Sequence, residues 1–170
     1  SSAQATGAGF TGANNLTINN AAGVTLTSNA SLAGTLTLTT GILDISSNTL
    51  TLSGTVTSTS GSIDADAGTV AFTNASNLSL PTSLFSGNIA TLSKTAGAGT
   101  LTLNDDLSLT NLNTSVSTGA VVLAANKQLT VDGTLTNNGT LTLKDGATLV
   151  QGTSGTSITG SGTYNVEKQL

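Results

Sequence analysis

The chain has 170 residues, of which 7% are charged and 2% aromatic, and its formal net charge is -4. It contains no Cys, His, Met, Trp or Arg, so most catalytic sets and most transition-metal sites lack their usual residues. The acidic balance gives no attraction to phosphate, and we therefore expect no nucleic-acid partner. No apolar run reaches the length of a membrane span, so none is expected.

The first 14 residues and the rest of the chain differ in pattern. Residues 1–14 are Ser, Ala and Gly around a single Phe10, and they predict a loosely ordered N-terminal segment. From Asn15 onward, apolar residues recur in pairs separated by one polar residue, such as Leu16/Ile18, Val24/Leu26, Leu36/Leu38, Leu43/Ile45 and Leu50/Leu52. This alternation predicts short strands, because successive side chains of a strand point to opposite faces. Gly, Asn, Asp and Ser between the pairs favour bends.

A longer period groups these strands. Equivalent apolar positions recur 20 to 23 residues apart, at Leu16, Leu36, Val56, Leu78, Leu101, Val121, Leu141 and Tyr164. A constant period that holds about three short strands predicts an all-β fold, a right-handed parallel β-helix (β-solenoid) of about seven coils. Residues 15–170 would form this single domain, with Leu, Val and Ile inside and Thr, Ser and Asn outside.

The middle of the chain is the least regular part, and residues 81–99 predict a distorted coil. Pro81, the only proline, removes a hydrogen-bond donor and is expected at a corner or strand end. Phe72 and Phe85 are expected to fill a wider core there, and residues 94–99 to form a bulged loop. Further on, Asn137-Asn138-Gly139 joins two strands. We favour a corner over a hairpin at this point, because a hairpin would break the period.

The acidic residues offer few sites. Asp105 and Asp106 are neighbours and predict a polar corner rather than a catalytic pair. Asp64 and Asp66 alternate with apolar residues and face outward on one strand, where they are candidates for weak Ca²⁺ binding, although the nonapeptide of calcium-binding β-helices is absent. A solvated strand face is the favoured interpretation. We predict no catalytic residue, no cofactor and no enzyme activity.

The aromatic residues and the Thr-x-Thr motifs are the remaining candidates for a binding surface. Phe72 and Tyr164 fall on inward positions, which favours core packing over a sugar platform. Thr-x-Thr recurs on the first strand of several coils, at Thr35/Thr37, Thr55/Thr57, Thr100/Thr102 and Thr140/Thr142. Such an outward array suggests an alternative function as a glycan-binding or ice-binding module. Asn77/Ser79 and Ala120/Val122 interrupt the array, and Thr is also simply a good exposed strand residue.

Several stretches carry a family resemblance. They are Asn14-Asn15-Leu16-Thr17-Ile18-Asn19-Asn20, Gly34-Thr35-Leu36-Thr37-Leu38 with Gly41-Ile42-Leu43-Asp44, residues 133–141, and Gly160-Ser161-Gly162-Thr163-Tyr164-Asn165-Val166-Glu167-Lys168. These stretches resemble repeat regions of large secreted Bacteroidetes surface proteins, adhesin-like substrates of the type IX secretion system. In that family Lys168 is more often Arg, and further domains follow. The resemblance implies a cell-surface stalk, adhesin or filament component, and it carries over no enzyme residues.

Composition and resemblance together lead to one functional expectation. A chain rich in Ser, Thr, Asn and Gly, without Cys, fits an extracellular bacterial protein, and its leading function is structural or adhesive. A terminal coil exposes unpaired N–H and C=O groups, so we expect the coils to continue beyond Leu170 or to stack end-to-end on another copy. A surface glycan is the alternative partner, and a fragment of a carbohydrate-active enzyme is the least favoured interpretation.

Overall fold

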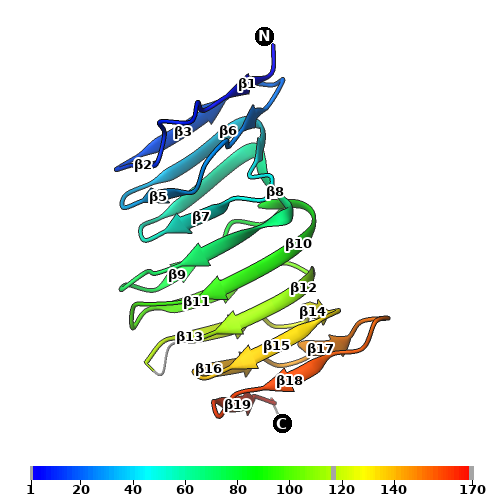
Figure 1. Cartoon of the computed structure of the whole chain (residues 1–170). Coiled ribbons are helices and arrows are strands. Elements are labelled where there is room, and N and C mark those ends of the chain that lie inside the picture. The colour runs from blue at the N-terminus through cyan, green and yellow to red at the C-terminus, as the bar shows by residue number, and fades with distance from the viewer. Residues whose placement is uncertain (1, 116–117, 169–170) are drawn as a thin grey trace.

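The computed structural model describes residues 2–115 and 118–168, and these residues form strands but no helix (Figure 1). The strands are β1 (Gln4–Ala5), β2 (Gly12–Ala13), β3 (Leu16–Asn19), β4 (Val24–Thr25), β5 (Ala30–Leu32), β6 (Leu36–Asp44), β7 (Thr49–Leu52), β8 (Val56–Phe72), β9 (Leu78–Ser79), β10 (Phe85–Lys94), β11 (Thr100–Leu103), β12 (Leu107–Thr114), β13 (Ala120–Leu123), β14 (Gln128–Val131), β15 (Thr134–Asn137), β16 (Thr140–Leu143), β17 (Thr148–Gln151), β18 (Ser157–Thr159) and β19 (Thr163–Val166). The described part of the chain therefore contains no helix that could cross a membrane.

Strands of successive turns pair in parallel and build a three-sided solenoid of about eight turns, which confirms the predicted fold class. The first side holds β3, the beginnings of β6 and β8, and then β9, β11, β13, β16 and β19. The second side holds β1, β4, the end of β6, the middle of β8, the beginnings of β10 and β12, β14 and β17. The third side holds β2, β5, β7, the ends of β8, β10 and β12, β15 and β18.

The expected number of turns was too low by one. The segment 1–14, expected to be loosely ordered, contributes β1 and β2, which pair with β4 and β5. With β3 they complete a first turn that the count from Leu16 had left out. Gln4–Ala5 and Gly12–Ala13 carry no apolar alternation, so periodicity could not reveal them.

Residues that lie 20 positions apart in the sequence pair with each other in adjacent turns. Leu16 pairs with Leu36 and Leu36 with Val56, and in the same way Leu101 pairs with Val121 and Val121 with Leu141. Like side chains therefore lie above one another, and one continuous apolar core runs through the turns. Each fully buried Leu, Val or Ile contributes about 1.5–3 kcal/mol relative to an exposed one.

Polar side chains at the corners join one turn to the next. The side-chain oxygen of Asn15 accepts the backbone N–H of Thr35 at 2.7 Å, and Asn29 does the same for Thr49 at 2.8 Å. Asn77 accepts the N–H of Thr100 at 2.9 Å. Corner Asn residues thus accept a backbone N–H at the start of a strand in the following turn and tie neighbouring turns together at the surface. Their frequency between the apolar pairs is explained by this role.

The expected corners are present. Pro81 lies between β9 and β10, outside both strands. β15 and β16, on either side of Asn138, pair with strands of other turns and not with each other. The corner interpretation of Asn137-Asn138-Gly139 is therefore confirmed.

The stack is irregular where β8 is followed by β9 and β10. On the first side β8 and β9 do not pair, and the described strands accordingly divide into a 14-stranded and a 5-stranded sheet. On the second side β10 pairs with β8 with register shifts between Phe85 and Ile89 and between Ile89 and Thr91. The intervening residues 86–88 are exposed. The register shifts in β10 fall within the predicted range 81–99, whereas β9 precedes that range.

Candidate functional site

The C-terminal end of the solenoid exposes its apolar core. Among the described residues, five large apolar side chains are exposed, and four of them belong to the last turn. These four are Val150, Ile158, Tyr164 and Val166, with Ile158 60% and Val166 73% exposed. Ile158, Tyr164 and Val166 stand in register with Leu135, Leu141 and Leu143 of the turn below, so they continue the inward columns at the open end of the core. Val150 stands on Thr130, an outward position of the second side.

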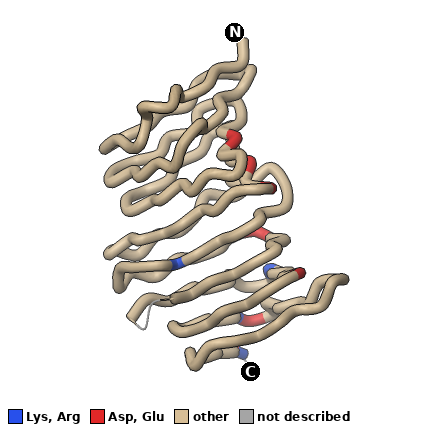
Figure 2. Tube along the Cα trace, viewed as in Figure 1, with Lys and Arg blue, Asp and Glu red and all other residues tan. Residues whose placement is uncertain are grey.

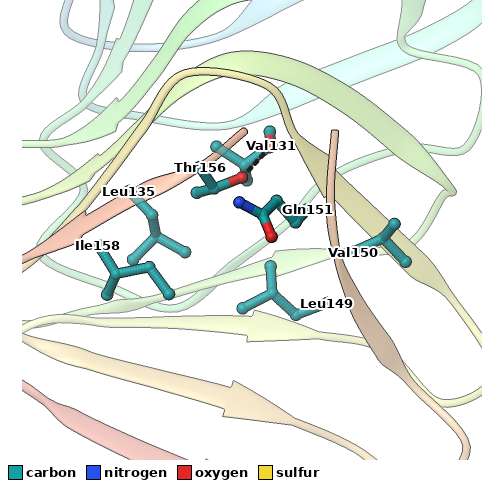
Figure 3. A pocket seen from close by; sticks show the side chains of 7 residues that line it. All are labelled: Val131, Leu135, Leu149, Val150, Gln151, Thr156 and Ile158. Atoms are coloured by element: carbon teal, nitrogen blue, oxygen red, sulfur yellow. Dashed lines mark hydrogen bonds between the residues drawn. The ribbon is translucent and has the colours of Figure 1, made fainter. Parts of the chain in front are cut away.

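A hollow of about 170 Å³ lies at this end (Figure 3). Leu135 and Ile158 border it from the third side, and Leu149 and Val150 from the second. The Thr156 hydroxyl donates to the carbonyl oxygen of Val131 next to it. Because the lining is largely apolar, the hollow favours an apolar side chain over water.

Tyr164 corrects one expectation. It was expected on an inward position, and its register with Leu141 agrees with that, yet it is 45% exposed. No described turn lies above it to complete the burial. The neighbouring ion pair of Lys144 and Glu167, at 2.8 Å, fastens the last strand to the turn below, but both side chains are exposed, so it contributes little to stability.

The Thr residues predicted as a binding face lie on the first side of the solenoid, as expected. Thr35 and Thr55 stack with their hydroxyl oxygens 2.8 Å apart, and Thr57 donates to Thr37 at 3.4 Å. These hydroxyls bond to one another across the turns. The four residues form the one place among the described residues where two Thr-x-Thr motifs occupy adjacent turns.

The remaining motifs are isolated from this group. β9 brings Ser79 against Thr102, and β13 brings Val122 between Thr102 and Thr142. Thr142 is itself buried, with 6% of its surface exposed, and Thr100 and Thr140 are half-buried on either side of Ala120. The face is therefore not a flat hydroxyl array, and its binding role stays a prediction.

Asp64 and Asp66 lie on the outside of β8, as predicted. The Asp64 carboxylate accepts the N–H of Asp66 at 3.3 Å, and Asp44 of the turn below stands in register with Asp64. No group of three or more Asp, Glu, His or Cys side chains suited to a metal occurs in residues 2–115 and 118–168. We therefore do not propose a Ca²⁺ site at Asp64 and Asp66.

Asp105 and Asp106 form a polar corner, as expected, but they act in opposite directions along the stack. Asp105 accepts the N–H of Ser83 in the turn below, whereas Asp106 accepts the N–H of Gln128 in the turn above at 2.7 Å. Both aspartates also border a groove beside Phe85. This groove could not be predicted from the sequence, because it lies beside the register shift in β10.

Lys94 was expected in a bulged loop, and here the prediction was wrong. It ends β10, and its side chain is 1% exposed. Its Nζ donates to the carbonyl oxygens of Asn74 at 3.1 Å, of Gly97 at 2.9 Å and of Ala96. Burial lowers the pKa of the Lys94 ammonium from its ordinary value of 10.5.

Lys94 belongs to an inward row of side chains on the third side. In order along the stack the row is Leu32, Leu52, Phe72, Lys94, Thr114 and Asn137. The row changes from apolar to polar at Lys94, and all six residues are buried. Since three carbonyl oxygens occupy the ammonium, Lys94 acts as a structural link rather than an accessible nucleophile.

No family model, curated protein or solved structure matches the chain.

Proposed function

We propose that the protein is a structural and adhesive β-solenoid segment outside the bacterial cell, a component of a stalk or filament, without catalytic activity. One observation carries this proposal: the apolar core reaches the C-terminal end and is left uncovered there by the described turns. Another turn would cover the core and at the same time pair the free edges of β17, β18 and β19.

The occupant we propose for this end is the first turn of a second copy. Its strands β1, β2 and β3 lie on the second, third and first sides, the same sides as β17, β18 and β19, so parallel pairing can continue. No charged residue precedes Asp44, and the first turn therefore brings no charge onto the apolar end. Contact of one end with the opposite end is heterologous and generates an open filament.

An extracellular location is supported by the surface chemistry. The exterior is rich in Thr, Ser and Asn, and the few charged residues are scattered along the chain (Figure 2). The continuous apolar core and the parallel hydrogen bonds between turns make the solenoid stiff, and disulfides are not needed for this. These properties suit a component that provides reach and surface.

End-to-end assembly is tested by replacing Ile158 with Lys. The change places a charge at the open end, and we expect it to convert concentration-dependent filaments into monomers in sedimentation velocity and electron microscopy. Ile42→Lys is the matched control, because Ile42 is the exposed large apolar residue in the described chain that lies away from this end. Monomers of the unchanged protein at every concentration would contradict the proposal, as would equal loss of assembly in both variants.

A further inference from the structure

A second concave surface lies on the outside of the solenoid, where the register shift in β10 pushes residues 86–88 outward. It is a groove of about 310 Å³ between this bulge and the corners of the next two turns. Its border includes Phe85, Asp105, Asp106, Leu107 and Lys127. The chain has only four lysines and eight acidic residues, yet one lysine and two aspartates meet here.

The two carboxylates are held in fixed positions. Asp105 uses Oδ2 to accept the N–H of Ser83, and Asp106 uses Oδ1 to accept the N–H of Gln128. Within the described residues, the second oxygen of each carboxylate has no hydrogen bond, and Lys127 has no ion pair. The groove therefore presents two immobilised acceptors and one cationic donor that the protein itself does not use.

The apolar part of the groove is equally defined. Phe85 and Leu107 are half-buried and pack against the core. Gly87, in the bulge, has no atom within 4 Å of the position where a Cβ would stand. An aromatic residue fixed by the core, beside open space, offers its remaining surface to a ligand.

We propose that this groove binds an uncharged sugar ring of a glycan. Carboxylate oxygens with one lone pair already engaged accept hydrogen bonds from sugar hydroxyls, and the Lys127 ammonium donates to them. The apolar C–H face of the ring packs on Phe85 and Leu107. Two carboxylates against one ammonium leave the groove with a negative charge, which disfavours acidic sugars. The site is separate from the Thr residues on the first side.

Glycan binding in this groove rests on the adhesive function proposed above and would supply its ligand. It does not depend on end-to-end assembly. Retention on a glycan surface and sedimentation are separate measurements, so one proposal can fail while the other stands.

The test begins with the full chain on an array of immobilised neutral, amino-bearing and sialylated oligosaccharides. We expect retention on neutral sugars, followed by titration calorimetry with the retained oligosaccharide. Asp106→Asn keeps the oxygen that accepts the Gln128 N–H but removes the charge, and Phe85→Leu removes the aromatic face. Each change should weaken binding about tenfold, the loss expected for one charge-assisted or aromatic contact.

Two control variants fix the location. Asp64→Asn removes an outward carboxylate elsewhere, and Thr35→Val alters the Thr face, so neither should change affinity. Circular dichroism of each variant confirms that it is folded. No retention on neutral sugars, retention on sialylated sugars alone, or equal weakening by Asp64→Asn or Thr35→Val would overturn the assignment.

Discussion

Asn137 offers the sharpest test of how the interior holds neighbouring turns together. It is fully buried, and its Nδ2 donates to the carbonyl oxygen of Thr163 at 3.0 Å. Its Oδ1 accepts the hydroxyl of Thr114 at 2.6 Å and the N–H of Gly139 at 3.2 Å. Replacing Asn137 with Ala removes all three hydrogen bonds, which link the turn below, the corner and the turn above.

The cost can be worked out group by group. Thr163 is exposed, so water replaces its lost donor, and the Thr114 hydroxyl still has the carbonyl oxygen of Thr136 at 3.4 Å. The N–H of Gly139 is buried and is left without an acceptor. One unpaired buried group costs about 1–3 kcal/mol, and the weakened Thr114 bond and the lost side-chain volume add to it. We expect a total near 3 kcal/mol.

The adjacent Asn138 is the matched control. It is exposed, and its side-chain oxygen accepts only the N–H of Ser161 at 3.4 Å, so Asn138→Ala should cost less than about 0.5 kcal/mol. Urea unfolding followed by far-UV circular dichroism measures both values by linear extrapolation. If the two variants lose equal stability, or if Asn137→Ala costs less than about 1 kcal/mol, the buried network does not hold the turns as described.

Two further changes test the interior and the corners. Because burial lowers the pKa of Lys94 below 10.5, the unfolded chain binds more protons than the folded chain between the two pKa values. The free energy of unfolding should therefore rise with pH across that interval, and Lys94→Met should remove this rise; the same slope in both proteins would refute the burial of the charge. Gly41 has φ +84°, and a Cβ there would lie 1.8 Å from the carbonyl oxygen of Asn20. Gly41→Ala should lower the free energy of unfolding by more than about 1 kcal/mol, whereas Gly87→Ala, which meets open space, should leave the urea midpoint near that of the unchanged chain.

The repeat could be predicted because each turn uses the same simple code. Leu36 and Leu38 alternate with Thr, and the same alternation returns 20 residues later around Val56, so periodicity alone gave the strands, their stacking and the inward faces. β1 and β2 were not predicted, because their side chains are small or polar and their pairing depends on the turn above. Tyr164 occupies the inward position that the period predicts, opposite Leu141, but it is not buried because no described turn covers it.

The candidate sites were harder to predict than the fold. Lys94 looks like a surface charge in the sequence, and only the row from Phe72 to Asn137 shows that it points inward. The groove depends on a shift of register in β10, which brings Phe85 beside Asp105 and Lys127 although these residues are far apart in sequence. Contacts made by an irregularity leave no periodic signal. The Thr-x-Thr motifs show the reverse, because their interruption by Ser79 and Val122 could be predicted from the period, and the register of β9, β11 and β13 agrees with it.

The unpaired stretch between β8 and β9 has a mechanical consequence. Elsewhere in the described chain, strands pair with those of the next turn on all three sides of the solenoid. β8 is hydrogen-bonded to the strands that follow it only through β10, on the second and third sides. Tension along the axis loads the turns in series, so the layer with the fewest bonds yields first. Under axial tension we therefore expect the turns to separate first between β8 and β9, while the turns on either side stay paired.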